Sequence, residues 1–274
     1  MGIQMILLDL DGTLLTSGKD LSPGNRAALE RAAARGVHIV PSTGRFYSGM
    51  PQVVRELPFV RYVVSINGAL IYDAAEDKAL RRADIPPEDA DRLFQRMEQL
   101  PVLYDCFIDG CGCMDRRHYE RVGEFVEDPA VRRLIQDLRR PVDDLRGYVR
   151  RTGTPVQKTQ MFFRTTEARD REMERFIRDF PDMSVTSSVS FNIEINAKAA
   201  SKGEGLRFLC QRLGIDPRDT MACGDGSNDV SMLQAAGVGV AMANADERLL
   251  AAADYVTDTN DNDGVAKAVE RFCL

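Results

Sequence analysis

The sequence predicts an α/β fold, in which a doubly wound, mostly parallel sheet carries an inserted second α/β domain. Short apolar runs alternate with helical segments near both ends of the chain, which is typical of a parallel sheet with helices on both faces. Several of these runs end directly in a polar cluster. The middle of the chain is more polar and has an alternating pattern of its own, which indicates the insertion.

Length and composition narrow the class of protein. The chain has 274 residues, 44% hydrophobic and 28% charged, which is ordinary globular composition and fits one large domain or two smaller ones. Acids outnumber bases by 42 to 36, which argues against nucleic acid as a partner because that function needs a basic face. No apolar run is long enough to cross a membrane or to form a signal peptide. We therefore expect a soluble, cytoplasmic protein.

The first part of the chain predicts alternating strands and helices. Residues 3–8 form a short apolar run that fits a buried strand. Ser22 and Pro23 are the expected N-cap and first residue of a helix that ends at Gly36. Further elements are strands at residues 37–40 and 62–66, a helix at 47–56, and an Asn67-Gly68 turn that leads into a strand at 69–72.

The sequence becomes more polar after about Ala83 and has an alternating pattern of its own. We predict a separate domain over residues 83–195, inserted into a core formed by residues 1–82 and 196–274. In the inserted domain we expect helices at 86–100, 119–139 and 167–180, and strands at 102–108, 158–163 and 191–195. The parallel pattern then resumes, with helices expected at 201–213, 229–236 and 246–252, and strands at 220–223, 238–242 and 255–256.

Four polar clusters follow predicted strands of the core, and loops at the carboxyl ends of parallel strands converge on one crevice. The first cluster is Asp9-Leu10-Asp11-Gly12-Thr13. Asp9 and Asp11 lie two residues apart after a strand, so their side chains point to the same side. Two such carboxylates repel each other unless a cation neutralises them, and ligands made only of oxygen favour Mg²⁺. A turn with an Asx cap is the alternative.

The other three clusters add groups that suit a phosphate. Ser42-Thr43-Gly44-Arg45 offers a hydroxyl and backbone amides at a strand-to-helix turn, which form an anion site or a plain helix cap. Lys202 begins a predicted helix, where a cation is unfavourable unless acids or phosphate face it; a solvated lysine is the alternative. Gly224-Asp225-Gly226-Ser227-Asn228-Asp229 supplies two more carboxylates and an amide. Together these groups suit phosphoryl transfer.

The motifs D-x-D-G-T, S-T-G-R, S-K-G and G-D-G-S-N-D, in this order and spacing, resemble those of the haloacid dehalogenase (HAD) superfamily of phosphohydrolases. The long insertion, the Asn67-Gly68-Ala69 turn and the tail at residues 257–265 are similar to its Cof-type branch (type IIB, with a C2 cap). Ala243 departs from the glycine usual in that branch. The resemblance covers nearly the whole chain and implies a Rossmann-like core with an α/β cap that sets substrate specificity.

The resemblance also implies a role for each matching residue. Asp9 would attack the phosphoryl group and form an aspartyl-phosphate, and Asp11 would protonate the leaving oxygen and later take a proton from water. Mg²⁺ would be held by the Asp9 side chain, the Asp11 backbone carbonyl and Asp225, with Asp229 supporting it through water. The expected phosphate-binding residues are Thr43, Gly44, Lys202 and Asn228. The residues alone leave open whether Asp9 or Asp11 is the nucleophile.

The predicted function is a Mg²⁺-dependent phosphomonoesterase of small phosphorylated metabolites, with sugar phosphates as the first choice. One alternative is a phosphosugar mutase, which uses the same nucleophile but returns the phosphate to the substrate. The other is a phospho-switch module, which needs only about 120 residues and no insertion. The sequence identifies neither the substrate nor the oligomeric state.

Overall fold

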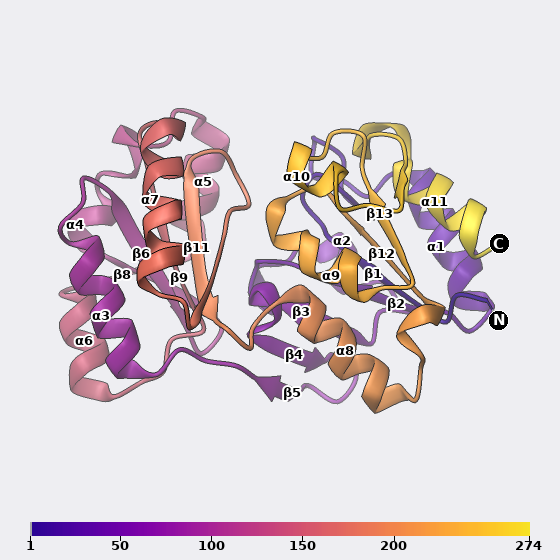
Figure 1. Ribbon diagram of the computed structural model, residues 1–274, viewed down its shortest axis with the longest axis horizontal. Helices are drawn as coiled ribbons and strands as arrows, with labels where there is room; N and C mark the ends of the chain where they lie inside the picture. Colours follow the sequence, from indigo (N-terminus) through magenta and orange to yellow (C-terminus); the bar gives the residue numbers. More distant parts are fainter. Residues whose placement is uncertain (1) are drawn as a thin grey trace. The chain divides into compact units, whose positions relative to one another are not determined.

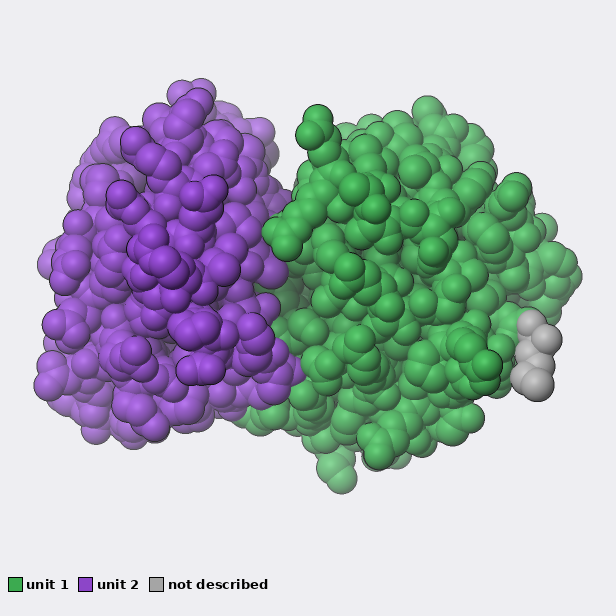
Figure 2. All heavy atoms as spheres, in the orientation of Figure 1, with its two compact units in different colours: residues 1–82, 200–274 green, residues 83–199 purple. Residues whose placement is uncertain are grey.

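The protein is described from a computed structural model that covers residues 2–274. It divides into two compact units (Figure 2). Within the described residues, unit 1 comprises residues 2–82 and 200–274, and unit 2 comprises residues 83–199. The chain returns to unit 1 at Ala200, after strand β11 (Asn192–Ala197) has completed its pairing in the sheet of unit 2. Unit 2 therefore ends at Ala199, whereas the sequence placed its end at residue 195.

Unit 1 is built on a five-stranded sheet in the order β14-β13-β12-β1-β2 (Figure 1). Its strands are β1 (Met5–Leu8), β2 (His38–Pro41), β12 (Thr220–Gly224), β13 (Val238–Ala241) and β14 (Tyr255–Val256). Each neighbouring pair is parallel. All residues of β1 and β12 are buried, which explains why these central strands are continuous apolar runs in the sequence.

Helices cover both faces of this sheet (Figure 1). Successive residues of a strand point to opposite faces: Ile6 and Leu8 pack with α1 (Pro23–Ala34) and α11 (Gly264–Phe272), whereas Met5 and Leu7 pack with residues of the other face. The helices on that other face are α8 (Lys202–Leu213), α9 (Val230–Ala235) and α10 (Glu247–Leu250). The prediction of a doubly wound α/β core is confirmed.

Three antiparallel strands form a second sheet of unit 1: β3 (Tyr62–Ser65), β4 (Leu70–Asp73) and β5 (Lys78–Arg82). Only one isolated parallel bridge, between Ser42 and Val64, joins β3 to the end of β2. The helix expected at residues 47–56 was wrong, because Pro51 separates a 3₁₀ turn (Tyr47–Gly49) from α2 (Gln52–Arg55). The other 3₁₀ turns of this unit are Ile66–Gly68, Pro217–Asp219, Ser227–Asp229 and Asn260–Asn262.

Unit 2 contains a six-stranded sheet in the order β10-β11-β9-β6-β7-β8. Its other strands are β6 (Leu103–Ile108), β7 (Cys111–Asp115), β8 (Arg139–Val142), β9 (Lys158–Phe162) and β10 (Met183–Thr186). All pairs are antiparallel except β7 with β8. The helices α3 (Pro87–Met97), α6 (Leu145–Thr152) and α7 (Thr166–Asp179) pack on one face, and α5 (Pro129–Asp137) packs on the other.

The single helix expected over residues 119–139 was wrong. This stretch contains the end of α4 (Arg116–Tyr119), a 3₁₀ turn (Val122–Glu124) and α5, and its last residue already belongs to β8. Asp128 caps α5 and Pro129 is its first residue, so the proline starts a new helix rather than continuing an old one. Throughout residues 2–274, no helix combines the length and apolar character needed to cross a membrane.

Candidate active site

Three neighbouring strands of the parallel sheet carry three of the four polar clusters at their carboxyl ends. Asp9 directly follows β1, and its N–H donates to the carbonyl oxygen of Cys223 in β12 at 3.0 Å. Ser42 follows β2, and its backbone N–H donates to the carbonyl oxygen of Leu8 at 2.7 Å. Asp225 directly follows β12. Because β12, β1 and β2 are adjacent, these loops meet at one edge of the sheet, as expected for parallel strands.

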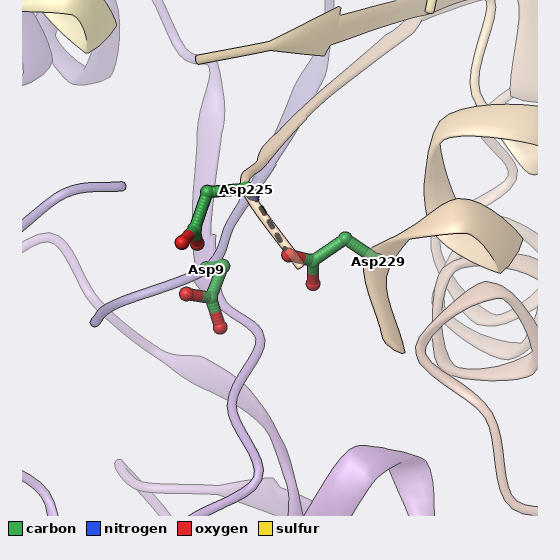
Figure 3. Close-up of side chains that lie close together, drawn as sticks. All are labelled: Asp9, Asp225 and Asp229. Carbon is green, nitrogen blue, oxygen red and sulfur yellow. Dashed lines mark hydrogen bonds between the residues drawn. The ribbon is translucent and has the colours of Figure 1, made fainter. Parts of the chain in front are cut away.

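The side chains of Asp9, Asp225 and Asp229 lie together at this edge (Figure 3). One carboxylate oxygen from each lies within 4.8 Å of the other two. In the part of the chain that the structure describes, no other three His, Cys, Asp or Glu side chains approach one another in this way. The sequence placed Asp229 beside the metal ligands, supporting the metal through water, and in the structure its carboxylate lies in the same cluster as those of Asp9 and Asp225.

Backbone contacts hold Asp229 in place. Its Oδ2 accepts a hydrogen bond from the N–H of Asp225 at 3.0 Å (Figure 3). The same oxygen accepts a second hydrogen bond from the N–H of Gly226 at 3.1 Å. A Cβ at Gly224 would lie 2.5 Å from the Cβ of Asp229, so only glycine allows this close approach. The G-D-G-S-N-D sequence therefore folds back on itself and presents two carboxylates to the same point.

Lys202 is the cation of the cluster. It is the first residue of α8, after the N-cap Ser201. Its Nζ donates to Oδ1 of Asp9 and to Oδ1 of Asp229, both at 2.5 Å, and its side chain is fully buried. Burial alone would lower the pKa of Lys202, but the charges of Asp229 and Asp9 outweigh it and raise the pKa. Lys202 therefore stays protonated, and it is not a solvated surface lysine.

The carboxylates of the cluster carry more negative charge than Lys202 neutralises. Burial, together with the charges of Asp229 and Asp225, raises the pKa of Asp9 despite the opposing effect of Lys202. Burial and the charge of Asp229 raise the pKa of Asp225 to about 7, although the Thr13 hydroxyl donates to its Oδ1 at 3.0 Å. At both carboxyls, therefore, burial and the neighbouring negative charges outweigh the positive charge of Lys202. A divalent cation that prefers oxygen ligands fits this donor set.

The Asp11 carboxylate is held by two cations instead. Arg45 donates from Nε to Oδ2 at 2.7 Å and from Nη2 to Oδ1 at 2.8 Å, and Lys19 Nζ donates to Oδ1 at 2.8 Å. Burial alone would raise the pKa of Asp11, but the hydrogen bonds and charge of Arg45 and the charge of Lys19 lower it. In this conformation Asp11 is therefore a carboxylate, and it must leave Arg45 before it can carry a proton.

The remaining predicted phosphate-binding residues lie on the loops that follow β2 and β12. Thr43 is almost fully buried, and its hydroxyl accepts from the N–H of Arg45 at 3.2 Å. Gly44 is half-buried in the same loop. Asn228 is 9% exposed, and its Nδ2 donates to Oδ1 of Asn67 at 3.2 Å.

Sequence reasoning missed three contacts of these groups. Arg45 was assigned only to an anion-binding turn, although its side chain holds Asp11. Lys19 belongs to no motif, and nothing in its sequence context indicates the contact with Asp11. Asn67 was expected only as a turn residue, although its position in an Asn-Gly pair indicated a special backbone conformation.

Comparisons with known proteins find similar proteins over nearly the whole chain. A family model described as haloacid dehalogenase-like hydrolase matches residues 6–269. The phosphatase YwpJ of Bacillus subtilis is 31% identical over 304 residues, which cover 98% of this chain and 100% of YwpJ. The 5-amino-6-(5-phospho-D-ribitylamino)uracil phosphatase YcsE of the same organism is 28% identical, covering 99% and 96% of the two chains. The solved structure of the HAD subclass IIB sugar phosphatase BT4131 matches with a TM-score of 0.82 and 25% identity over 98% of both chains.

Proposed function

Since this chain belongs to the haloacid dehalogenase-like hydrolase family, we propose that it is a Mg²⁺-dependent phosphatase that hydrolyses small phosphorylated metabolites. The observation that carries this proposal is the cluster of Asp9, Asp225 and Asp229, in which the buried Lys202 donates to Asp9 and Asp229. A phosphoryl group is stabilised by positive charge around its oxygens. The ammonium group of Lys202 supplies one such charge, and acidic oxygens beside it can hold a cation that supplies another. Two relatives named as phosphatases, each aligned over nearly its full length, support the same reaction.

The surplus of carboxylates supports a Mg²⁺ site. We assign its ligands to the side chains of Asp9 and Asp225 and to the backbone carbonyl of Asp11, with Asp229 beside them. The raised pKa values of Asp9 and Asp225 support this assignment, because burial and the neighbouring carboxylates outweigh the positive charge of Lys202 at both carboxyls. When bound, Mg²⁺ supplies charge neutralisation at the phosphoryl oxygens.

In the proposed reaction a carboxylate oxygen of Asp9 attacks phosphorus, and the bond from phosphorus to the ester oxygen breaks. The leaving oxygen takes its proton from Asp11, which first has to leave Arg45 and become protonated. Lys202, Thr43, Gly44 and Asn228 bind the phosphoryl oxygens. Asp11 then takes a proton from water, whose oxygen attacks the aspartyl-phosphate and releases inorganic phosphate from Asp9.

We further propose that unit 2 acts as the cap domain and sets substrate specificity, and that sugar phosphates are the first substrates to test. BT4131 is described as a sugar phosphatase, and the name of YcsE contains a phosphoribityl group. Both names support a phosphate ester of a small polyhydroxylated molecule. A cytoplasmic location belongs to the same proposal.

The direct test is phosphate release from a panel of sugar phosphates and from 4-nitrophenyl phosphate in the presence of Mg²⁺. We expect turnover by the wild type, loss on chelation of the metal, and a loss of roughly 10⁴-fold or more in Asp9→Asn. Asp143→Asn is the matched control, because Asp143 is an exposed aspartate of unit 2. Release of no phosphate from any ester, or equal rates in Asp9→Asn and wild type, would contradict the proposal. Accumulation of an isomerised sugar phosphate without free phosphate would identify a mutase instead.

A further inference from the structure

The turn between β3 and β4, residues Ile66–Gly68, has an unusual backbone conformation. All three residues have positive φ angles, of 53°, 56° and 92°. Asparagine and glycine adopt such angles readily, but a β-branched isoleucine rarely does. All three are buried. Strain of this kind persists only where the surrounding structure holds it, and it concentrates at functional sites.

The first contacts of the turn are with the S-T-G-R loop. The N–H of Ile66 donates to the carbonyl oxygen of Arg45 at 3.0 Å, and the N–H of Asn67 donates to the carbonyl oxygen of Thr43 at 2.9 Å. The left-handed conformation thus aims two successive amides at two carbonyls on either side of Gly44. The turn thereby fixes the backbone of the loop that carries Thr43.

The second contact is with the loop that follows β12. Oδ1 of Asn67 accepts a hydrogen bond from Nδ2 of Asn228 at 3.2 Å, and both side chains are buried, at 4% and 9% exposure. An asparagine amide has a donor end and an acceptor end. With Asn67 as acceptor, Asn228 turns its NH₂ group toward the turn and keeps a second N–H on the same nitrogen. A phosphate oxygen needs that donor end, so the observed pairing leaves Asn228 in the orientation that a phosphate can use.

The third contact is with the start of α8. A Cβ at Gly68 would lie 2.2 Å from the carbonyl oxygen of Ser201, which precedes Lys202. The backbone of the turn therefore packs directly against the residue that begins the Lys202 helix. Three consecutive residues thus contact the loops that carry Thr43, Asn228 and Lys202.

We propose that the Ile66–Gly68 turn positions the phosphate-binding side chains of unit 1, and that Asn67 is a positioning residue that acts through Asn228. The proposal rests on the proposed function, because it assigns the turn to the same phosphate site. Its physical basis is that one strained turn holds three loops from distant parts of the sequence. Asn67 and Asn228, for example, are 161 residues apart.

The first test is a double-mutant cycle between Asn67→Gly and Asn228→Ala. Glycine keeps the positive φ of residue 67 but removes the amide. The readouts are the KM for 4-nitrophenyl phosphate and the inhibition constant of inorganic phosphate, together with Tm. We expect Asn67→Gly to raise both constants about 5-fold, as the loss of one hydrogen bond predicts. In the Asn228→Ala background the same change should have no further effect.

The second test compares two glycines. Gly68 and Gly36 have similar φ angles of 92° and 86°, but nothing lies within 4 Å of a Cβ at Gly36. Gly68→Ala and Gly36→Ala therefore introduce similar backbone strain, and only Gly68→Ala also pushes on Ser201. We expect kcat to fall 10-fold or more in Gly68→Ala and to stay within 2-fold of wild type in Gly36→Ala.

Each outcome decides one point. Additive effects of Asn67→Gly and Asn228→Ala on KM and phosphate inhibition, or no effect of Asn67→Gly, would overturn the role of Asn67. Equal kcat in the two glycine variants would overturn the role of the turn at α8, and if Gly68→Ala does not fold, the cycle through Asn67 decides alone. A wild type that hydrolyses no phosphate ester would instead contradict the proposed function, so the two failures are distinguishable.

Discussion

Each unit of the protein contains one fully buried lysine, and the two lysines have different surroundings. Lys202 of unit 1 donates to two carboxylates, both at 2.5 Å. Lys158 of unit 2 donates to Oε1 of Glu194 at 2.8 Å and lies 4.5 Å from the centre of the Phe107 ring. Burial lowers the pKa of Lys158 despite the opposing charge of Glu194. The pKa of Lys202 is raised, because two carboxylates outweigh the same effect of burial.

The difference between the two sites is their charge balance. In unit 2 the pair of Lys158 and Glu194 is neutral, and so is the neighbouring pair of Arg139 and Asp105 at 2.7 Å. In unit 1 Asp225 adds a third carboxylate to Asp9 and Asp229, which leaves a surplus of negative charge. A buried ion pair alone is weak evidence of function, since it also occurs as a structural feature. A surplus of carboxylates with raised pKa values supports the proposed cation site in unit 1, and among the described residues unit 2 offers no such surplus at Lys158.

The largest expected difference comes from removing each lysine. Lys202→Met and Lys158→Met should each destabilise the fold by about 3–5 kcal/mol, because each leaves a buried charge without its partner. Only Lys202→Met should also lower kcat for 4-nitrophenyl phosphate, by about 10²- to 10³-fold, because it removes a cation from the phosphoryl site. The measurement is kcat at saturating Mg²⁺, at a temperature where both variants are folded. A loss of kcat in Lys158→Met as large as in Lys202→Met would show that the neutral pair also serves the reaction.

The second prediction concerns pH and metal removal. The pKa of Asp225 in the folded protein is about 7, well above that of an aspartate in an unfolded chain. The folded state therefore binds more protons between these two values, and the stability due to protonated Asp225 is lost as pH rises toward 7. Without metal, the free energy of unfolding should decrease by about 2–3 kcal/mol between pH 4.5 and 7.5. Mg²⁺ should reverse this loss, because it binds the deprotonated carboxylates.

The control for this prediction is a pair of neutralised carboxyls, Asp225→Asn in unit 1 and Glu194→Gln in unit 2. Thermal melts with and without Mg²⁺ at several pH values give the measurement. Asp225→Asn should reduce both the decrease with pH and the gain from Mg²⁺, leaving the part due to the raised pKa of Asp9, and Glu194→Gln should keep both in full. A Mg²⁺ effect on Tm that is equal at pH 5 and pH 7.5 would argue against a metal site formed by these carboxylates.

The parts of the fold that could be predicted from the sequence are those with a strong local signal. The central strands are short apolar runs that end in aspartate, and the Ser22 cap of α1 is a local side-chain contact with the N–H of Asn25. Strand β5 was missed, because its sequence KALRR is charged and half-exposed. The helices predicted at residues 47–56 and 119–139 were wrong because Pro51 precedes the start of α2 and Pro129 is the first residue of α5. A helical pattern on either side of a proline does not make one helix.

The candidate site also has parts that could be predicted from the sequence and parts that could not. The positions of Asp9 and Asp225 follow from the rule that parallel strands end at one edge of a sheet, so the sequence was sufficient to bring them together. The contacts of Arg45 and Lys19 with Asp11 depend on how two loops run past each other. No periodicity in the sequence reports the path of a loop. The same is true of Asn67 and Asn228, whose hydrogen bond depends on the whole sheet between them.

The smallest predicted effect compares the N-caps of two helices. Ser201 caps α8 in unit 1 and Thr165 caps α7 in unit 2, and both are extended, with φ angles of -140° and -138°. Each hydroxyl accepts a hydrogen bond from the third N–H of its helix, at 3.1 Å from Glu204 and 3.2 Å from Ala168. Ser201→Ala and Thr165→Ala should therefore cost about 1 kcal/mol each.

The two caps should differ in their effect on turnover. Ser201 precedes Lys202, so loss of its cap loosens the first turn of α8 and changes the position of the Lys202 ammonium group relative to the phosphoryl oxygens of the proposed site. We therefore expect kcat to fall 2- to 5-fold in Ser201→Ala. Thr165→Ala should lower Tm as much as Ser201→Ala does, but it should leave kcat unchanged. If both variants keep the wild-type kcat, the contact between Gly68 and Ser201 is enough to hold the start of α8 without its cap. The hydroxyl of Ser201 would then contribute to stability alone, as the hydroxyl of Thr165 does.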